Sequence, residues 1–392
     1  MSAQDRDTRV ILPGATLGVL GGGQLGRMFA QTAQAMGYFT AVLDKDETSP
    51  AGLVSHHHIR SGYEDPQGLA ELARLCAAVT TEFENVPAGS LNRLAESLPV
   101  SPAGSAVAIA QDRAAEKAHF VKCSVPCAPY AVIETPGQLA AVNDVLLPGI
   151  VKTARMGYDG KGQVRVTTRE ELNTAWEQLG RVPCVLEKML PLALECSVIV
   201  ARGRDGTIVN LPVQRNLHRD GILAVTEVYA GNLPATQVEK AIAAARSVAI
   251  GLDYVGVLCV EFFVLTDGML VVNEIAPRPH NSGHYSQNAC DVSQFELQVR
   301  CMTNLPLTQP RQHSPSIMLN LLGDLWFKNS SEARSPAWDQ VLALPGCALH
   351  LYGKHDAKRA RKMGHLNITG ATPEAVRATA LKAAAILGIE PF

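Results

Sequence analysis

Two glutamates stand inside apolar strand patterns, and their spacing suggests chemistry more directly than any other feature of the chain. Glu261 lies in the run Val257 to Val264, and Glu274, preceded by Asn273, ends the next apolar run. An ionised carboxylate among apolar neighbours is costly unless it meets a cation or a strong hydrogen-bond donor. A tight turn between the runs would pair the strands and set both carboxylates side by side for Mg²⁺. The pattern predicts a magnesium site; a hairpin with both glutamates on its solvated face is the alternative.

A glycine-rich loop follows an expected strand at 149–153, which carries Lys152 near its end. The loop comprises Gly157, Tyr158, Asp159, Gly160, Lys161, Gly162 and Gln163. Glycine lets the backbone approach phosphate oxygens closely, and the lysines of the strand and the loop supply cationic donors. The loop is not a Walker A motif, because a strand at 163–166 rather than a helix follows it. It predicts a cover over the phosphates of a nucleotide; a flexible hairpin is the alternative.

Another glycine-rich segment, Gly21 to Gly26, lies between an expected strand at 16–20 and an expected helix at 24–36. Its backbone N–H groups and the helix N-terminus form the kind of site that binds anions. Asp44 ends the following strand, where a dinucleotide-binding fold places the carboxylate that binds ribose. The turn therefore keeps a nicotinamide-dependent dehydrogenase open as a rival function. A turn that only packs a strand against a helix is the simplest alternative.

The elements expected around these motifs divide the chain into three parts. Residues 16–100 alternate strands and helices, as in a doubly wound parallel α/β sheet. A long helix is expected at 106–123, and a small α+β unit with the size of a lid follows at 149–188. Mostly antiparallel strands come next, and a helix at 373–387 closes the chain. We predict domains at 1–115, 116–193 and 194–392.

Composition narrows the possible partners and location. The 392 residues include 35 basic and 37 acidic ones, so the formal net charge of -2 favours neither nucleic acid nor an anionic membrane. The cysteines are scattered without C-x-x-C spacing, which indicates reduced thiols in a cytoplasmic protein. The chain has no apolar run of membrane-spanning length and no signal-peptide core. His56, His57 and His58 are adjacent, so they point in different directions and are interpreted as surface residues rather than a metal site.

The order of these motifs resembles the ATP-grasp superfamily, in which ATP lies between two α+β subdomains. Within it, five segments are similar to those of carboxyaminoimidazole ribonucleotide synthases: GGGQLGRM at 21–28, TEFENV at 81–86, GYDGKGQ at 157–163, NEIAPRPHNSGHY at 273–285 and RKMGH at 361–365. One departure is visible, because the family usually has R-P-G-R-K where this chain has Lys358, Arg359, Ala360, Arg361 and Lys362. The resemblance implies an ATP-grasp fold with an N-terminal doubly wound domain, a small lid subdomain and a larger C-terminal subdomain.

The family's reaction is what the resemblance implies for function. ATP would phosphorylate bicarbonate to carboxyphosphate, which carboxylates the amine of 5-aminoimidazole ribonucleotide and releases ADP and phosphate. The implied cofactors are ATP and Mg²⁺, and the implied assembly is a homodimer. A formate-dependent glycinamide ribonucleotide transformylase, which shares the fold, and a non-catalytic nucleotide-binding module remain as rivals.

The resemblance also implies which residues form the sites. For ATP it implies Arg113, Lys152, the loop 157–163, Glu187, Lys188, Met189, Leu190, Glu195, His218, Asn273 and Glu274. For bicarbonate and the ribonucleotide it implies Gly23, Gln24, Leu25, Glu84, Tyr158, Asp159, Arg278, His280, Asn281, Ser282, Lys354, Arg361 and Lys362. The implied catalytic residues are Arg278, His280 and Lys152, and Glu261 and Glu274 would bind the metal. An arginine fork suits bicarbonate oxygens, and a histidine can donate a proton or a hydrogen bond.

Overall fold

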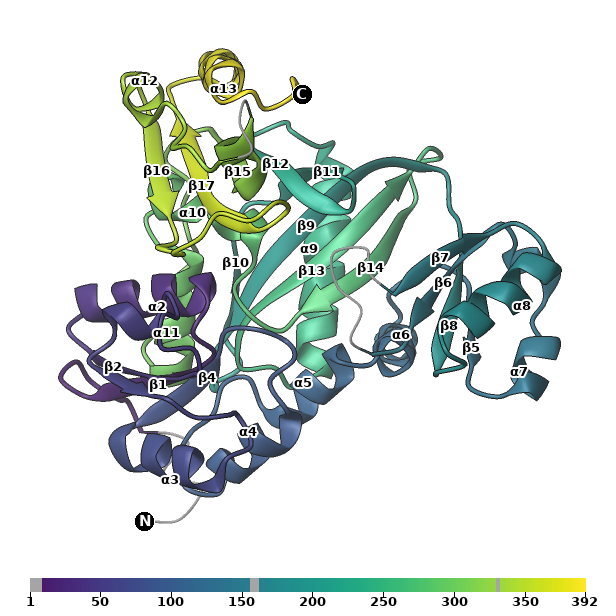
Figure 1. Cartoon of the computed structure of the whole chain (residues 1–392), viewed down its shortest axis with the longest axis horizontal. Coiled ribbons are helices and arrows are strands. Elements are labelled where there is room, and N and C mark those ends of the chain that lie inside the picture. The colour runs from purple at the N-terminus through teal and green to yellow at the C-terminus, as the bar shows by residue number, and fades with distance from the viewer. Residues whose placement is uncertain (1–8, 156–161, 329–331) are drawn as a thin grey trace.

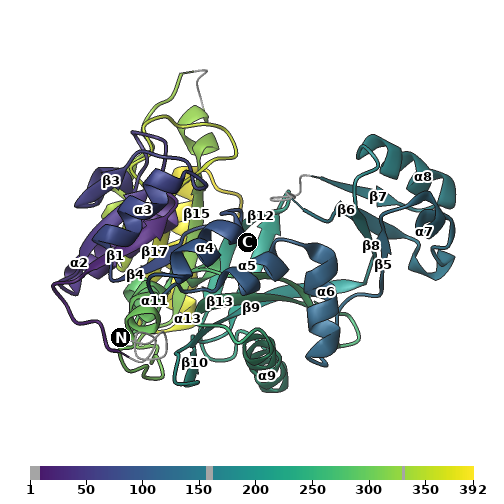
Figure 2. The ribbon, with the colours of Figure 1, turned by 90° about the horizontal axis from the view of Figure 1, so that it is seen from below.

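The strands of the chain form three sheets (Figure 1). The computed structural model describes residues 9–155, 162–328 and 332–392. Within these residues a parallel sheet of four strands lies beside an antiparallel sheet of nine, while another sheet of four strands stands apart at one side. Figure 2 shows the same separation from below. The combination of a parallel α/β part with antiparallel α+β parts confirms the predicted fold class.

The N-terminal part is a doubly wound α/β unit with the strand order β3-β2-β1-β4. Its elements are β1 (Thr16–Leu20), α2 (Gln24–Ala35), β2 (Phe39–Leu43), η1 (Gly52–Val54), β3 (His57–Ile59), α3 (Pro66–Leu75), β4 (Ala78–Thr81) and α4 (Ala88–Ala95). The strand β1 has the predicted bounds, and both β1 and β4 are buried along almost their whole length. The edge strand β3 is short and was not predicted. His58 donates from Nε2 to the backbone oxygen of Asp44 (3.0 Å), so it holds a surface strand in place.

The sequence predicts a single helix at 106–123, and this prediction is wrong. The structure has two helices there, α5 (Gly104–Ala110) and α6 (Arg113–Lys122). The carboxylate of Asp112 accepts hydrogen bonds from the N–H groups of Ala114 and Ala115 (3.0 and 3.2 Å), so it caps and begins a new helix. The break lets α6 run towards the isolated sheet and places Arg113 in its first turn.

The isolated sheet forms the predicted lid. Its strands follow the antiparallel order β5-β8-β6-β7. Its elements are β5 (Tyr130–Ile133), α7 (Pro136–Ala140), η2 (Asp144–Leu146), β6 (Gly149–Thr153), β7 (Gln163–Val166), α8 (Arg169–Gln178) and β8 (Cys184–Lys188). Leu172 and Trp176 of α8 pack on Val151 and Leu186 of the sheet. Because side chains alternate along a strand, Lys152 and Glu187 lie on the opposite face of this sheet.

The central sheet extends from the predicted metal strands to the C-terminal part, in the order β14-β13-β9-β11-β12-β15-β17-β16 with β10 on β9. Its strands are β9 (Leu192–Arg202), β10 (Ile208–Asn210), β11 (Gln214–Arg219), β12 (Ile222–Val228), β13 (Gly256–Leu265), β14 (Leu270–Ala276), β15 (Ser316–Leu322), β16 (Cys347–Leu351) and β17 (Lys362–Thr369). The associated helices are α9 (Ala235–Gly251), η3 (Asn281–Gly283), α10 (Ser286–Ala289), α11 (Gln294–Thr303), η4 (Gly323–Phe327), α12 (Trp338–Leu342) and α13 (Pro373–Leu387). The strands β15, β16 and β17 were not predicted.

Helices cover the two faces of the central sheet unequally. On one face, Val198 of β9 and Val260 of β13 belong to the same core as residues of α9. On the other face, Ile199 and Val257 pack with residues of α11. Glu261 shares this second face further along its strand, because side chains alternate. On this second face, the polar side chains that include Glu261 therefore begin beyond the part of the sheet that α11 covers. No helix among the described residues is long and apolar enough to span a bilayer.

Candidate active site

The two glutamates are direct neighbours across an antiparallel pair of strands. Glu261 on β13 faces Glu274 on β14, and a bulge follows between Glu261 and Phe262. The side chain of Glu261 is 13% exposed and that of Glu274 is 41% exposed. The predicted strand pairing is confirmed, and a fully solvated face is excluded for Glu261. Their binding of a metal stays a prediction.

Each of these carboxylates has a hydrogen-bonding partner. His280 Nε2 lies 3.0 Å from Glu261 Oε1, and Arg113 Nη1 lies 3.2 Å from Glu274 Oε2. Burial raises the pKa of Glu261, but its contact with His280, with His218 and Arg278 nearby, outweighs burial and lowers the pKa. Glu261 is therefore an ionised, buried carboxylate at neutral pH.

The oxygen ligands that the β13–β14 pair offers fit a hard divalent cation. The carboxylates of Glu261 and Glu274 are oxygen donors of the kind that Mg²⁺ takes. Cys259, Glu261 and His280 also form a group whose possible ligand atoms lie within 4.8 Å of one another. Burial raises the pKa of the Cys259 thiol well above its usual value, so this group stays protonated. The carboxylates rather than the thiol are the suitable ligands.

The residues predicted to bind ATP form ion pairs with one another. Besides the pair of Arg113 and Glu274, Lys152 Nζ lies 3.2 Å from Glu187 Oε1, and His218 pairs with Glu195. Burial raises the pKa of Glu187, but nearby lysines outweigh burial and lower it. These contacts bring residues from α6, the lid and the central sheet together, and this group of residues is called the cleft below.

Sequence reasoning missed Lys117, which links the two walls of this cleft. Its side chain is 1% exposed, and Nζ lies 3.2 Å from Glu187 Oε2 in the lid. The same ammonium donates to the backbone oxygen of Asn273 on β14 (2.9 Å). Lys117 lies one turn after Arg113 on α6, so both side chains share one face of the helix, and this spacing is the signal that could have found it.

The lid loop is covered only in part. Gly157, Tyr158, Asp159, Gly160 and Lys161 lie outside the described residues. Gly162 has a φ of 70°, which favours glycine, and its oxygen accepts a hydrogen bond from the N–H of Thr153 (2.9 Å). Gln163 faces Lys152 across the strand pair. After β8 the backbone N–H of Met189 donates to the oxygen of Pro148 (2.9 Å), with Lys188 and Leu190 on either side. The roles of all these residues stay predictions.

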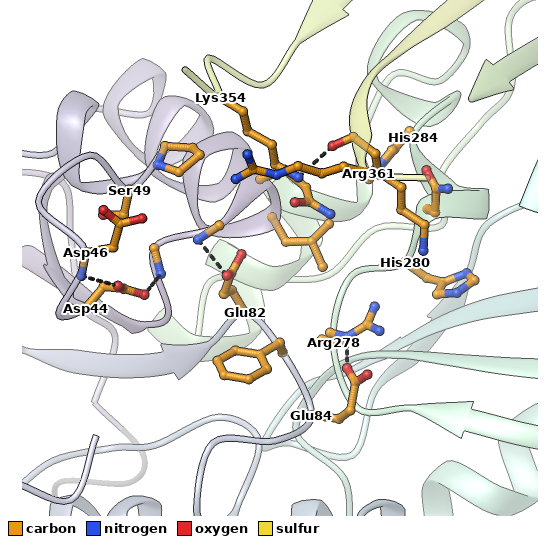
Figure 3. Close-up of a pocket in the computed structure, with 18 of the residues that line it drawn as sticks. Asp44, Asp46, Ser49, Glu82, Glu84, Arg278, His280, His284, Lys354 and Arg361 are labelled. Atoms are coloured by element: carbon orange, nitrogen blue, oxygen red, sulfur yellow. Dashed lines mark hydrogen bonds and ion pairs between the residues drawn. The ribbon is translucent and has the colours of Figure 1, made fainter. Parts of the chain in front are cut away.

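A cavity of about 430 Å³ lies beside the cleft (Figure 3). Most residues predicted to bind bicarbonate or the ribonucleotide line it: Gly23, Gln24, Leu25, Glu84, Arg278, His280, Asn281, Lys354, Arg361 and Lys362. They come from the N-terminal unit, from the segment after β14 and from the C-terminal strands, so three distant parts of the chain meet here. Ser282 is fully buried and does not line this cavity; its Oγ lies 2.9 Å from His280 Nδ1.

Arg278 and Glu84 form an ion pair that lines this cavity (Figure 3). Arg278 Nε lies 2.5 Å from Glu84 Oε2, and Arg278 also donates to the oxygen of Pro279. Burial raises the pKa of Glu84, but the charge and hydrogen bond of Arg278 outweigh it and lower the pKa to about 2. The carboxylate in turn raises the pKa of Arg278 against its own burial. Both groups remain ionised in the cavity wall.

The glycine turn differs from the predicted anion site. Its N–H groups at Gly23 and Gly26 donate to the two carboxylate oxygens of Glu82 (2.6 and 2.8 Å), and the N–H of Gly22 donates to Asp44 (2.7 Å). The prediction that the amide of Gly23 serves an external anion is therefore corrected, because the partly buried carboxylate of Glu82 already accepts from this amide at the start of the helix.

Other amides of the same turn remain suitable for an anion. Among the described residues the structure records no acceptor for the backbone N–H groups of Gln24 and Leu25, which line the cavity. Asp44 also accepts from Tyr63 Oη (2.7 Å), so its carboxylate is engaged inside the protein. This removes the feature that favoured a dinucleotide site.

Several further cavity residues carried no clear signal in the sequence. They are Asp46, Ser49, Pro50, Tyr63, Phe83 and His284. Phe83 and His284 lie inside the motifs at 81–86 and 273–285, where the stronger charged residues drew attention. The others occupy loops after β2 and β3, whose position beside the cavity follows only from the folded chain.

Comparison with known proteins now identifies the family. Family models match residues 14–111 as a ribonucleotide synthetase preATP-grasp domain, 118–295 as an ATP-grasp domain and 316–379 as a phosphoribosylaminoimidazole carboxylase C-terminal domain. An N5-carboxyaminoimidazole ribonucleotide synthase of Brucella melitensis is 41% identical over 363 residues, which cover 92% of this chain and 98% of the relative. The chain belongs to the N5-carboxyaminoimidazole ribonucleotide synthase family.

Solved structures of N5-carboxyaminoimidazole ribonucleotide synthases share the whole fold. A crystal structure of such a synthetase with ADP has a TM-score of 0.89 and 39% identity, and covers 97% of this chain and 98% of its own. A structure from Aspergillus clavatus with ADP and 5-aminoimidazole ribonucleotide has a TM-score of 0.86 and 31% identity, with 95% and 98% covered. The predicted ATP-grasp fold is confirmed.

The C-terminal departure from the synthase family has a local structural consequence. Ala360 stands where the family usually has glycine, and its φ of 59° is left-handed. Its N–H donates to Asp324 Oδ2 (2.7 Å), and the next residue, Arg361, donates its N–H to the oxygen of Lys358 (3.1 Å). A glycine would adopt this turn without steric cost, which explains the usual residue.

Lys354 and Arg361, two cationic residues of this segment that line the cavity, donate hydrogen bonds to backbone oxygens. Lys354 Nζ donates to the oxygen of Lys362 (2.6 Å), and Arg361 Nη1 donates to the oxygen of Asp356 (3.1 Å). Burial, together with the charges of Arg361 and Lys362, lowers the pKa of Lys354 to about 8. These carbonyl partners orient the two cations, while the carboxylates of Glu82 and Asp46 act on them through their charge.

Proposed function

We propose that the chain catalyses ATP-dependent carboxylation of 5-aminoimidazole ribonucleotide by bicarbonate. The products would be 5-(carboxyamino)imidazole ribonucleotide, ADP and phosphate, as in de novo purine biosynthesis. The observation that carries the proposal is the cavity where Arg278, His280, Lys354 and Arg361 meet beside the paired glutamates. The Aspergillus clavatus relative, solved with ADP and the same ribonucleotide, supports the choice of substrates.

The cleft between the lid and the central sheet is the proposed ATP site. Lys152 and Arg113 would approach phosphate oxygens once their carboxylate partners are released. Glu261 and Glu274 would hold Mg²⁺, which neutralises phosphate charge when bound. Phosphoryl transfer needs positioning and charge stabilisation more than covalent chemistry from the protein, and these side chains supply both.

The segment after β14 is the proposed bicarbonate site. The guanidinium of Arg278 offers further N–H donors beyond the one that holds Glu84, and it has a fork that matches a planar anion. His280 lies between Glu261 and the cavity, and its Nε2–H, which faces Glu261 here, would be shared with the reacting group once Glu261 binds the metal. This arrangement places the phosphoryl acceptor between the cleft and the cavity.

The ribonucleotide is proposed to fill the cavity. The N–H groups of Gln24 and Leu25 at the start of α2 suit its phosphate, because a helix N-terminus favours an anion. Lys354 and Arg361 add positive charge on the opposite wall, and the ionised Glu84 can accept a hydrogen bond from the reacting amine. The cavity therefore has separate groups for the two ends of the substrate.

Measurement of ADP release tests this function. We expect release to require both bicarbonate and 5-aminoimidazole ribonucleotide, with each omitted in turn. Release that depends on formate and glycinamide ribonucleotide instead would establish the transformylase rival, and tight NAD(H) binding would revive the dehydrogenase. The homodimer and the cytoplasmic location stay predictions, to be tested by sedimentation and cell fractionation.

A further inference from the structure

A row of buried polar side chains crosses the central sheet beside Glu261. The register of the strands sets Glu261 on β13 opposite Ser197 on β9. Further along, Ser197 faces Gln214 on β11, and Asn216 on β11 faces Thr226 on β12. Ser197 and Thr226 have no exposed surface. Buried polar groups of this kind persist where hydrogen bonds satisfy them, so the row must have partners.

Consecutive hydrogen bonds link the far end of the row to Ser282 in η3. Thr226 Oγ1 lies 3.0 Å from Asn216 Oδ1, and Asn216 Nδ2 lies 2.9 Å from Ser197 Oγ. Ser197 Oγ then lies 2.8 Å from Ser282 Oγ. Because a carbonyl oxygen only accepts and an amide nitrogen only donates, Thr226 donates to Asn216 and Asn216 donates to Ser197.

The near end of the row reaches His280, whose surroundings decide where its proton lies. His280 Nε2 faces the Glu261 carboxylate at 3.0 Å, and this carboxylate can only accept. On the other side of the ring, the backbone N–H of Ser282 points at Nδ1 (3.3 Å). The Nε2–H tautomer satisfies both neighbours, so the Ser282 hydroxyl, 2.9 Å from Nδ1, is the donor in that contact.

The direction of the remaining bond follows from that assignment. Ser282 uses its only hydroxyl proton on His280, so Ser197 donates to Ser282. Each hydrogen bond of the row is then donated in the same direction, from Thr226 towards Glu261, and aligned hydrogen bonds strengthen one another. Gln214 Oε1 lies 3.0 Å from Ser197 Oγ and competes for the same proton. The reversed row, which ends at Gln214, would require a proton on His280 Nδ1.

We propose that Ser282 and Ser197 are positioning residues that hold His280 in the tautomer with its proton on Nε2, aimed at Glu261. Neither serine lines the cavity, so the role that we assign to them acts through His280. The kinetic consequence rests on the proposed function, in which His280 acts on the reacting group. The tautomer itself is independent of that function. Ser316 offers a matched control, because it is a fully buried serine of the same sheet whose Oγ has no hydrogen-bond partner among the described residues.

Nitrogen NMR of protein labelled with ¹⁵N-histidine tests the tautomer, with His280→Gln used to assign the signals. The wild type should show one protonated and one unprotonated nitrogen for His280, with the proton on Nε2. Ser282→Ala should shift the signals towards Nδ1 protonation, Ser197→Ala should shift them less, and Ser316→Ala should leave them unchanged. A wild-type His280 protonated on Nδ1, or on both nitrogens, would overturn the proposal.

Kinetics of the same variants test the positioning role. Ser282→Ala should lower kcat by about 10-fold or more, as removal of an outer-shell partner typically does, while KM for ATP stays constant. Thr226→Val, an isosteric change at the far end, should lower kcat less, and it also serves if the alanine variants fail to fold. Serine variants that match Ser316→Ala in both kcat and NMR signals would refute the role. Absence of any ADP release by the wild type would count against the proposed function alone, because the NMR result needs no turnover.

Discussion

The cleft proposed for ATP and the cavity proposed for the ribonucleotide use their charges differently. In the cleft six residues predicted to bind ATP form pairs of opposite charge: Arg113 with Glu274, Lys152 with Glu187, and His218 with Glu195. In the cavity Arg278 is paired with Glu84, whereas the cations Lys354 and Arg361 bond to backbone oxygens. Carbonyl partners orient a cation without cancelling its charge.

This difference suggests different tasks for the two sites. In the cleft a bound nucleotide must replace internal ion pairs. Its phosphates would take the place of the carboxylates beside the cations, and its metal would take the place of the cations beside the carboxylates. In the cavity a positive wall already faces the position proposed for an anionic ribonucleotide, which raises its local concentration. Variants of the cleft and of the cavity should therefore affect different substrates.

The largest loss of turnover is expected at the two glutamates that are proposed to bind the metal. Glu261→Ala and Glu274→Ala should each lower turnover by more than the roughly 10- to 100-fold loss typical of outer-shell changes, because each removes a proposed ligand of Mg²⁺. ADP release titrated with Mg²⁺ measures this, and Glu239→Ala, an exposed glutamate of α9, is the control. Turnover close to that of the wild type at limiting Mg²⁺ would remove either residue from the metal site.

The junction of cleft and cavity should show the next largest effect. Arg278→Lys keeps the charge but loses the fork, so it cannot hold Glu84 and an anion as the guanidinium does. Because hydrogen bonds to charged groups contribute about 1.5 to 3 kcal/mol, turnover should fall roughly 10- to 150-fold. Initial rates against bicarbonate, with KM for ATP as the control, measure it. A change in KM for ATP alone would assign Arg278 to the ATP site and not to the bicarbonate site.

The cavity wall should respond to pH through Lys354. Burial and neighbouring cations lower its pKa to about 8, so the ammonium loses its charge above that pH rather than above 10. An anionic substrate should then bind less well, and kcat/KM for the ribonucleotide should fall up to about tenfold per pH unit above 8. In Lys354→Arg the charge persists, and this fall should disappear. Identical pH profiles for the two proteins would contradict the assignment.

The smallest effect is expected at the turn beside the cavity. Ala360→Gly should stabilise the protein by about 1 kcal/mol, because the left-handed backbone at this position is costly for alanine. Chemical denaturation measures the gain. Ala357→Gly, on the same segment with no positive φ, should instead give no gain. Equal changes in the two variants would show that the turn stores no strain.

Local patterns in the sequence predicted the cleft better than the cavity. The bounds of β1, β6, β7 and α13 follow from apolar runs and turn residues, and they agree with the structure. The facing glutamates followed from two apolar runs separated by a tight turn. These features depend on residues that are close in the sequence, where periodicity is informative.

The C-terminal wall of the cavity depends on contacts between distant segments. β17 pairs with β15 and β16, and these strands carry Lys362 and the turn with Arg361 to the cavity. Only the family resemblance brought these cations to the site, because no local pattern encodes strand order. The binding of the turn amides by Glu82 was likewise hidden, since that carboxylate reaches Gly23 from a strand far along the chain.

One kinetic comparison tests the separation of cleft and cavity most directly. Apparent KM values for ATP and for 5-aminoimidazole ribonucleotide are measured in Arg361→Ala and in Lys152→Ala. Loss of charge-assisted hydrogen bonds from Arg361 should raise KM for the ribonucleotide by about 10- to 150-fold and leave KM for ATP constant. Lys152→Ala should raise KM for ATP and leave that for the ribonucleotide constant. Equal changes in both constants, in either variant, would contradict the separation.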